Sequence, residues 1–228
     1  MTEIEKIYGI KIDNSDLFRI ALTHPSYTQE NSLSYNENYE RLEFLGDAVL
    51  KLLTSEILYN KYPDYTEGDL SKIRSIVVSD NILSKIAHDI GLCKLIILSK
   101  HETKQGLADI ESVCACAFEA ILGAFYLDRK LDESKLFLHK VLMPYIEEVD
   151  KNFEKYNAKA ILQEYTQSVN KKTPIYELID ETGPAHNKLF TVEVSFQEHI
   201  IAKGSGKSKK EAEQQAAYLA CKSLGVIK

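Results

Sequence analysis

Apolar residues recur at three- and four-residue steps through most of the first 150 residues. The clearest run lies between Tyr39 and Lys61, and Pro63 follows it closely. This period is typical of an amphipathic helix, and a proline shortly after it is typical of a helix end. Similar spacing predicts further helices over residues 70–90, 112–127 and 133–146. The sequence therefore predicts that residues 1–150 form an all-helical domain.

The pattern changes beyond the polar stretch at residues 147–157. A short helical stretch is followed by three with β character, at residues 158–169, 174–179, 189–196 and 199–202. Between Phe190 and Phe196 apolar and polar residues alternate, which is the period of a half-buried strand. Ser208 is a good N-cap for a last helix, and Glu211 three residues later predicts a capping box there.

These two patterns predict a multi-domain fold, in which an all-α domain is followed by a small α+β domain of order α-β-β-β-α. We expect the domains to occupy residues 1–150 and 157–228. Residues 151–156 are then the linker between them.

The net charge of −6 is unevenly distributed between these two parts. Residues 155–228 carry 11 lysines and 8 acidic side chains, a net charge of +3. The first 154 residues carry 17 basic and 26 acidic side chains, a net charge of −9. A basic module suits a polyanion, whereas a surplus of carboxylates suits hard divalent cations. The overall acidity therefore does not exclude a nucleic-acid partner.

The composition excludes several classes of protein. With 44% hydrophobic and 27% charged residues, the chain is typical of a globular protein. No apolar run approaches the roughly 18 residues that span a bilayer, and the acidic start from Met1 to Glu5 does not resemble a secretory signal. We therefore expect a cytoplasmic protein with no membrane partner. The four cysteines lack both zinc-ligand pairing and a disulfide framework, so we expect reduced, mostly buried thiols.

Three carboxylates lie on one face of the first long predicted helix. Glu40, Glu43 and Asp47 are spaced at i, i+3 and i+7, so their side chains project together. A solvated acidic stripe is one interpretation of this spacing. The surrounding residues are largely apolar, however, and partly buried carboxylates need a cation or hydrogen-bond donors.

The segment at residues 40–50, ERLEFLGDAVL, resembles the signature helix of the ribonuclease III family. Further segments resemble other blocks of that family in the expected order: residues 21–27 (ALTHPSY), 67–71 (EGDLS) and 117–124 (AFEAILGA). The resemblance spans nearly the whole chain. It implies a helical endonuclease domain that hydrolyses double-stranded RNA, leaving 5′-phosphate and 3′-hydroxyl ends, in the processing of ribosomal and messenger RNA.

The same resemblance implies roles for five acidic residues. Glu43, Asp47 and Glu119 would hold Mg²⁺, with Mn²⁺ as a possible substitute, and Asp47 and Glu119 would be catalytic. Glu40 and Glu67 would support the site. Hard oxygen ligands suit Mg²⁺, which keeps several waters and can share phosphate oxygens with a substrate. The family resemblance also implies a homodimer with one site for each RNA strand.

The chain departs from the family pattern at Cys116. The family has an aspartate three residues before the glutamate that matches Glu119, so a carboxylate of the metal site is replaced by a thiol. A thiol is mostly neutral near pH 7, and its soft sulfur prefers zinc to magnesium. Three hypotheses remain open: an active nuclease, a cleavage-impaired protein that mainly binds double-stranded RNA, and a thiol that recruits a softer metal or responds to oxidation.

Three segments of the second part resemble the contact regions of a double-stranded RNA-binding domain, at residues 158–165, 183–186 and 204–213. Such a domain reads the shape of A-form RNA through two minor grooves and the phosphates between them. The resemblance implies minor-groove contacts and phosphate contacts by these residues: Gln163, Glu164, Pro184 and His186 for the grooves, and Lys207, Lys209 and Lys210 for the phosphates. A solvated lysine run is the alternative for the last three.

Residues 206–208, Gly-Lys-Ser, are similar to the end of a nucleotide-binding P-loop. That motif needs a glycine five residues before Gly206, where this chain has Ile201. We therefore expect no nucleotide cofactor.

Overall fold

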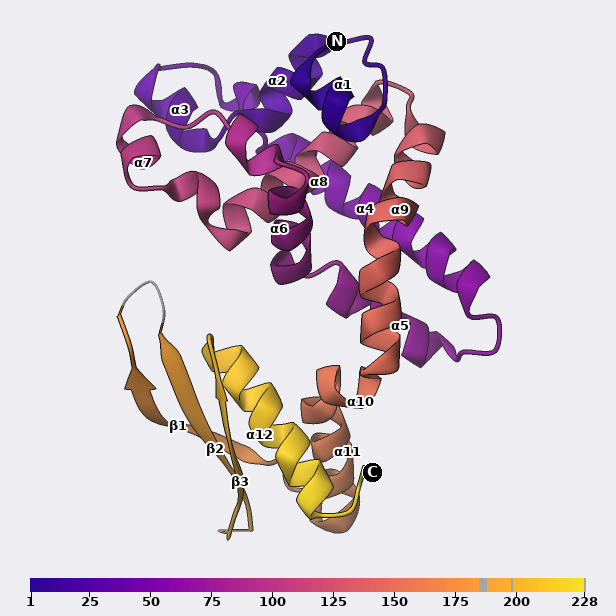
Figure 1. Cartoon of the computed structure of the whole chain (residues 1–228), viewed down its shortest axis with the longest axis vertical. Helices are drawn as coiled ribbons and strands as arrows, with labels where there is room; N and C mark the ends of the chain where they lie inside the picture. The colour runs from indigo at the N-terminus through magenta and orange to yellow at the C-terminus, as the bar shows by residue number, and fades with distance from the viewer. Residues whose placement is uncertain (185–187, 198, 228) are drawn as a thin grey trace. The chain divides into compact units, whose positions relative to one another are not determined.

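The computed structural model describes residues 1–184, 188–197 and 199–227. It divides into two compact units, Met1–Glu148 and Val149–Lys228 (Figure 1). Within the described residues, no helix is both long enough and apolar enough to cross a membrane.

The first unit is built from helices. Its α-helices are α1 (Glu3–Tyr8), α2 (Ser15–Leu22), α3 (Pro25–Glu30), α4 (Glu40–Lys61), α5 (Glu67–Val77), α6 (Asp80–Asp89), α7 (Lys100–Lys104), α8 (Glu111–Leu127) and the larger part of α9 (Leu131–Lys151). Three short 3₁₀ helices connect them: η1 (Tyr35–Glu37), η2 (Leu92–Leu95) and η3 (Leu107–Asp109). The all-helical prediction for this part of the chain is confirmed.

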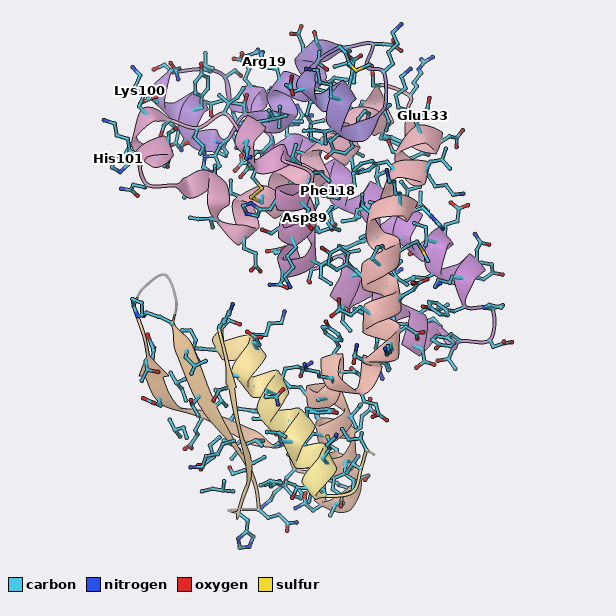
Figure 2. The ribbon with its side chains drawn as sticks, viewed as in Figure 1. Arg19, Asp89, Lys100, His101, Phe118 and Glu133 are labelled. Carbon is cyan, nitrogen blue, oxygen red and sulfur yellow. A yellow bond between two sulfur atoms is a disulfide. The ribbon has the colours of Figure 1, made fainter. Side chains whose placement is uncertain are left out.

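Helix α8 is the centre of this unit, and α2, α4 and α6 pack against it (Figure 1). Most of its residues are buried, including Phe118, which Figure 2 labels and which is fully buried. A helix that is apolar on nearly all sides is stable only when other elements surround it. Helix α4 has the bounds that its apolar period predicts, and its buried face carries Leu42, Val49, Leu50 and Leu53.

The helix predicted over residues 70–90 is two helices, α5 and α6, because the chain breaks at Ser79. This residue has an extended backbone, with φ −75° and ψ 151°. Its hydroxyl donates a hydrogen bond back to the Ile76 carbonyl oxygen, 2.7 Å away. Serine side chains compete with helical hydrogen bonds in this way, and the apolar period alone does not reveal it.

The second unit contains the predicted α-β-β-β-α order, preceded by one short helix. The elements are α10 (Phe153–Tyr156), α11 (Ala158–Asn170), β1 (Ile175–Thr182), β2 (Leu189–Phe196), β3 (His199–Gly206) and α12 (Lys209–Ser223). The strands form an antiparallel sheet of order β1-β2-β3. Val192 and Val194 are buried, as the alternating pattern of β2 predicts. The α+β prediction is confirmed.

Helix α12 packs closely on β3 because Gly204 lacks a side chain. A Cβ at Gly204 would lie 2.1 Å from the Ala216 backbone nitrogen. At the start of α12, Ser208 caps the helix by accepting a hydrogen bond from the Glu211 amide, at 3.1 Å. The Glu211 carboxylate accepts from the Lys207 amide, at 2.8 Å, so the predicted reciprocal bond to Ser208 is not the one formed.

Candidate functional site

The site predicted from the acidic residues depends on how closely α4 and α8 approach. They cross at two glycines, Gly46 and Gly123. A Cβ at Gly123 would lie 2.3 Å from the Leu42 carbonyl oxygen, and one at Gly46 would lie 3.1 Å from the Gly123 nitrogen. Only glycine fits such backbone contact. The crossing brings the acidic face of α4 against α8.

Glu43, Asp47 and Glu119 are close enough to act on one another. Burial, together with the charges of Asp47 and Glu43, raises the pKa of Glu119 to about 8. Burial likewise raises the pKa of Glu43, with added repulsion from Glu40 and Asp47. Lys51 pairs with Asp47 at 2.7 Å and partly offsets this negative charge. Three of the predicted metal ligands thus converge from two helices, whereas an exposed acidic stripe would not be desolvated.

Cys116 lies within this group, half-buried on α8. Burial, together with the neighbouring Glu43 carboxylate, raises the pKa of its thiol to about 12. The neutral thiol donates a hydrogen bond to Glu43, and the buried Tyr39 hydroxyl lies near enough for Cys116 to contribute to its raised pKa, which burial mainly causes. Cys116 therefore enters the site as a neutral donor to a carboxylate.

Asp80 joins the group without having been predicted. It lies in the first turn of α6, and its negative charge raises the pKa values of Glu43, Cys116 and Glu119. Its position in the sequence does not indicate that it joins the other acids, because it lies on a third helix, α6. The break at Ser79, which starts α6 at this residue, is what presents it to the site.

The two predicted supporting acids differ in where they lie. Glu40, in the first turn of α4, contributes to the raised pKa of Glu43. Glu67 is exposed in the first turn of α5 and accepts a hydrogen bond from the Ser71 hydroxyl at 2.7 Å. In the described part of the chain, Glu67 is not among the largest causes of the pKa shifts of Glu43 and Glu119. The structure brings Glu40, but not Glu67, to the acidic group.

The described RNA-binding candidates of the second unit are all exposed: Gln163 and Glu164 on α11, Pro184 after β1, and Lys207, Lys209 and Lys210 at the start of α12. The remaining candidate, His186, lies outside the described residues. Within those residues, the ammonium groups of the three lysines make no ion pair within 4.0 Å. The Lys188 ammonium lowers the pKa of Glu181, and the charge of Lys209 adds a smaller contribution, so the start of α12 lies near the end of β1.

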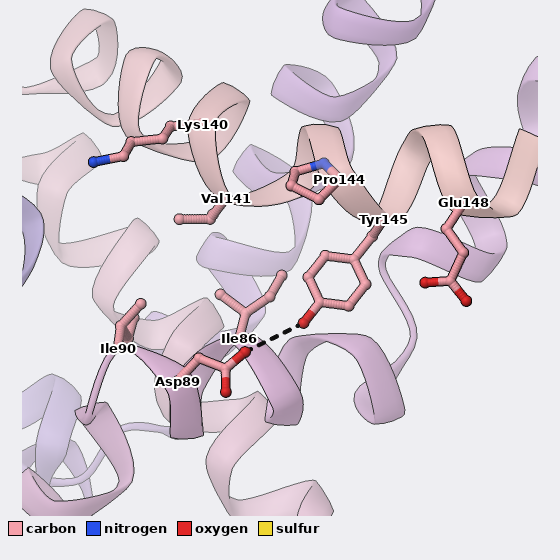
Figure 3. Close-up of a pocket in the computed structure, with 8 residues that line it drawn as sticks. All are labelled: Ile86, Asp89, Ile90, Lys140, Val141, Pro144, Tyr145 and Glu148. Carbon is pink, nitrogen blue, oxygen red and sulfur yellow. Dashed lines mark hydrogen bonds between the residues drawn. The ribbon is translucent and has the colours of Figure 1, made fainter.

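A shallow groove of about 460 Å³ lies elsewhere, between α6 and α9 (Figure 3). The Tyr145 hydroxyl and the Asp89 carboxylate meet in it at 3.5 Å. None of the predicted acids lines this groove. The groove and the acidic group therefore lie in different places. The acidic group is the better candidate for catalysis, because its carboxylates raise one another's pKa values.

The cysteines differ from the expectation of four reduced thiols. Cys93 and Cys114 form a disulfide, drawn as a yellow bond in Figure 2, while Cys116 and Cys221 are free. The two partners are 21 residues apart in sequence, and only the packing of η2 against α8 brings them together.

Two family models match the chain. One, described as ribonuclease-III-like, matches residues 14–146, and the other, described as double-stranded RNA binding motif, matches residues 158–224.

Curated relatives and solved structures agree with these matches. Ribonuclease 3 of Staphylococcus epidermidis strain ATCC 12228 is 42% identical over 223 residues, covering 98% of this chain and 91% of that protein. Ribonuclease 3 of Staphylococcus aureus strain JH9 is 42% identical over 228 residues, covering 100% of this chain and 92% of that protein. A structure of the nuclease domain of ribonuclease III from Campylobacter jejuni, concerned with flexibility in a region involved in dimer formation, is 34% identical. Its TM-score is 0.56, over 61% of this chain and 94% of that one.

Proposed function

The chain belongs to the ribonuclease III family and is an endoribonuclease, and from that premise we propose that it uses Mg²⁺ to hydrolyse double-stranded RNA at the Glu43–Asp47–Glu119 group. The observation that carries the proposal is the mutual repulsion of these acids. Burial and neighbouring carboxylates raise the pKa of Glu119 to about 8. Proteins place carboxylates together at such a cost where a cation or a proton transfer requires them.

The side chains fit Mg²⁺ rather than a softer metal. Glu43, Asp47 and Glu119 offer hard carboxylate oxygens, and they would be the ligands. Cys116 holds its proton and hydrogen-bonds Glu43, so it would orient that ligand instead of binding the ion. When bound, the cation lowers the pKa of water and offsets negative charge on the phosphodiester. Mn²⁺, with similar ligand preferences, would substitute.

Glu119 and Lys51 have defined roles in the proposed reaction, one in proton binding and one in positioning a carboxylate. Without the cation, Glu119 has a pKa of about 8 and holds a proton at neutral pH, and binding of the cation would displace that proton. Lys51, paired with Asp47 at 2.7 Å, holds that carboxylate in place on its helix. In the hydrolysis, a water oxygen bonds to phosphorus while the bond to the 3′ oxygen breaks, and that oxygen takes a proton. The products would carry 5′-phosphate and 3′-hydroxyl ends.

The second unit would bind double-stranded RNA. A helix N-terminus has free N–H groups and a positive dipole end, and α12 adds Lys207, Lys209 and Lys210 at that end. These three lysines would contact phosphates, while Gln163, Glu164 and Pro184 would reach minor grooves. The domain bounds of 1–150 and 157–228 also stay a proposal, because α9 extends to Lys151 and α10 occupies most of the expected linker.

A homodimer in the cytoplasm is the proposed working form, with ribosomal and messenger RNA as the proposed substrates. Helix α4 presents an exposed apolar face with Phe44 82% exposed, Leu52 60% and Tyr59 73%. Large exposed apolar side chains on one helix face are typical of an interaction surface. A second copy of the chain would cover this face and place two sites on one RNA duplex.

A second candidate function rests on Cys116. If the missing carboxylate weakens the metal site enough, the protein would bind double-stranded RNA without cutting it. The neutral thiol beside Glu43 supports this alternative, because it contributes no negative charge toward a divalent ion.

Cleavage of a long RNA duplex in Mg²⁺ or Mn²⁺, measured beside binding in chelator, tests the proposal. We expect the wild type to cut, and Glu119→Gln and Asp47→Asn each to slow cleavage by about 10²–10³-fold without weakening binding. Glu133→Gln, which removes one exposed charge on α9, is the matched control and should cut normally. A wild type that binds but never cuts in either metal would favour the second candidate. Full cleavage by Glu119→Gln would reject the site itself.

A further inference from the structure

A second group of side chains that could bind a metal lies at the start of α8. It consists of His88 at the end of α6, Cys93 in η2 and Cys114 in α8. One ligand atom from each residue lies within 4.8 Å of the other two. The His88 Nε2 atom is 3.6 Å from the Cys114 sulfur, and the Cα atoms of the two cysteines are 5.5 Å apart. None of the three residues takes part in the nuclease chemistry proposed above.

We propose that this group binds one thiophilic divalent cation, with Zn²⁺ the best match, when the Cys93–Cys114 disulfide is reduced. Zinc binds cysteine sulfur at about 2.3 Å and histidine nitrogen at about 2.0–2.1 Å in tetrahedral geometry, which separates the nitrogen from a sulfur by about 3.6 Å. The distance from Nε2 to the Cys114 sulfur has this value before any ion is present.

Charge and burial also suit this cation. Cys93 is 2% exposed and Cys114 is fully buried. Two thiolates and a neutral imidazole cancel the charge of a divalent ion, and a buried site tolerates a neutral complex better than a charged one. A water would complete the four ligands, because the Ala108 carbonyl oxygen, 2.9 Å from the Cys114 sulfur, lies too close to that sulfur to be the fourth ligand of a tetrahedral ion. His88 is exposed and opens the site to solvent.

Binding requires a reductant, because the two sulfurs are joined in the structure. Two equivalents of a low-molecular-weight thiol break the sulfur–sulfur bond, giving two cysteine thiols and one small disulfide. The cation then displaces two protons from these thiols and forms two metal–sulfur bonds. Exchange with the small disulfide reverses the sequence: the Cys93–Cys114 bond re-forms, the small disulfide takes two protons to give two small thiols, and the ion is released. Cys93 and Cys114 therefore link η2 and α8 by a disulfide, whereas a bound metal would join α6 to both through His88.

This site and the nuclease site differ in the ions that they prefer. Soft sulfur and imidazole ligands select zinc or cobalt, whereas the carboxylates of the nuclease site select Mg²⁺ or Mn²⁺. Cobalt(II) distinguishes the two, because thiolate ligation gives a sulfur-to-cobalt charge-transfer band that carboxylates do not give. The inference does not depend on whether the chain cuts RNA.

The experiment adds Co²⁺, and then Zn²⁺, to the full chain reduced with a phosphine and freed of other metals. We expect one cobalt per chain with thiolate bands, the loss of those bands when zinc is added, and a higher melting temperature with zinc. His88→Ala should weaken binding by more than the roughly 10–100-fold that loss of a supporting partner costs. Cys93→Ser and Cys114→Ser should abolish the bands. Because His88 is exposed, its variant should fold even if a cysteine variant does not.

Three control variants locate the signal. His101→Ala removes another exposed histidine, Cys116→Ser removes the thiol of the nuclease site, and Glu119→Gln removes a carboxylate there. All three should keep the cobalt bands. The inference is overturned if the reduced wild type shows no thiolate band, if His88→Ala binds like the wild type, or if the bands disappear with Cys116→Ser. It is equally overturned if the pair stays a disulfide in excess reductant, since the thiolates then never form.

Discussion

The carbonyl oxygen of Glu119 lies 1.7 Å from the position that a Cβ on Gly46 would occupy. The residue that carries a candidate catalytic carboxylate on α8 is therefore in direct backbone contact with α4. Any side chain at position 46 must move the two helices apart. The same movement separates Glu43 and Asp47 from Glu119, so the stability of the crossing and the proposed metal site both depend on one glycine.

Gly46→Ala should lower the free energy of unfolding by about 1–3 kcal/mol or more, because overpacking a contact this close forces a backbone shift. Mg²⁺ should also protect the variant less against unfolding than it protects the wild type. Chemical denaturation with and without the ion measures both effects. Gly68→Ala is the matched control: the nearest atom to its Cβ is 3.8 Å away, and alanine in a helix should add about 0.5–1 kcal/mol. Equal outcomes for the two variants would contradict the crossing described above.

Cys116→Asp should tighten Mg²⁺ binding by roughly 10–100-fold, because it replaces a neutral thiol with a hard ligand beside Glu43. Cleavage of an RNA duplex should then reach its maximum rate at a lower Mg²⁺ concentration. A magnesium titration of the cleavage rate, beside Cys116→Ser as a neutral control, measures the change. If aspartate and serine give the same magnesium dependence, position 116 does not contribute to the metal site.

The pKa of Glu119 predicts how metal-free stability depends on pH. The folded value of about 8 lies above the ordinary 4.5, so the folded state binds this proton more tightly than the unfolded state does. The stabilisation is complete below about pH 4.5 and is lost as the pH rises through 8. In chelator, the melting temperature of the helical unit should therefore fall as the pH rises over this range. Glu119→Gln should make the melting temperature depend less on pH. Parallel curves for the two proteins would contradict the raised pKa.

The sequence predicts those features that depend on local spacing. The apolar period predicts α4 within one residue of each end, and the i, i+3, i+7 spacing predicts that Glu40, Glu43 and Asp47 share a face. The alternation in β2 predicts its buried valines. In each case the residues that form the feature are neighbours on one element, so backbone geometry alone relates them.

Apart from the meeting of Glu119 with Glu43 and Asp47, which the family resemblance implies, features that depend on packing between elements are not predicted. Asp80 reaches the acidic group from a helix whose start is set by one serine. Cys93, Cys114 and His88 meet only because η2 and α6 both contact α8. No period or motif links such residues in one sequence. The family resemblance names Glu67 as a site residue. It gives no information on whether Glu67 lies beside Glu43 within one chain, and Glu67 is not among the main causes of the raised pKa of Glu43.

The lysines at the start of α12 give the last prediction, which concerns the salt dependence of RNA binding. Neutralising a phosphate releases a condensed counterion, so each contacting lysine adds about one to the slope of log affinity against log salt. Lys207→Gln, Lys209→Gln and Lys210→Gln together should reduce that slope by about three for each bound domain. Binding of the full chain to a duplex in chelator, titrated with monovalent salt, measures it. Lys172→Gln, an exposed lysine outside the three contact regions, should leave the slope unchanged. If the triple variant keeps the wild-type slope, these lysines form only a solvated face, and another surface of the domain must bind the phosphates.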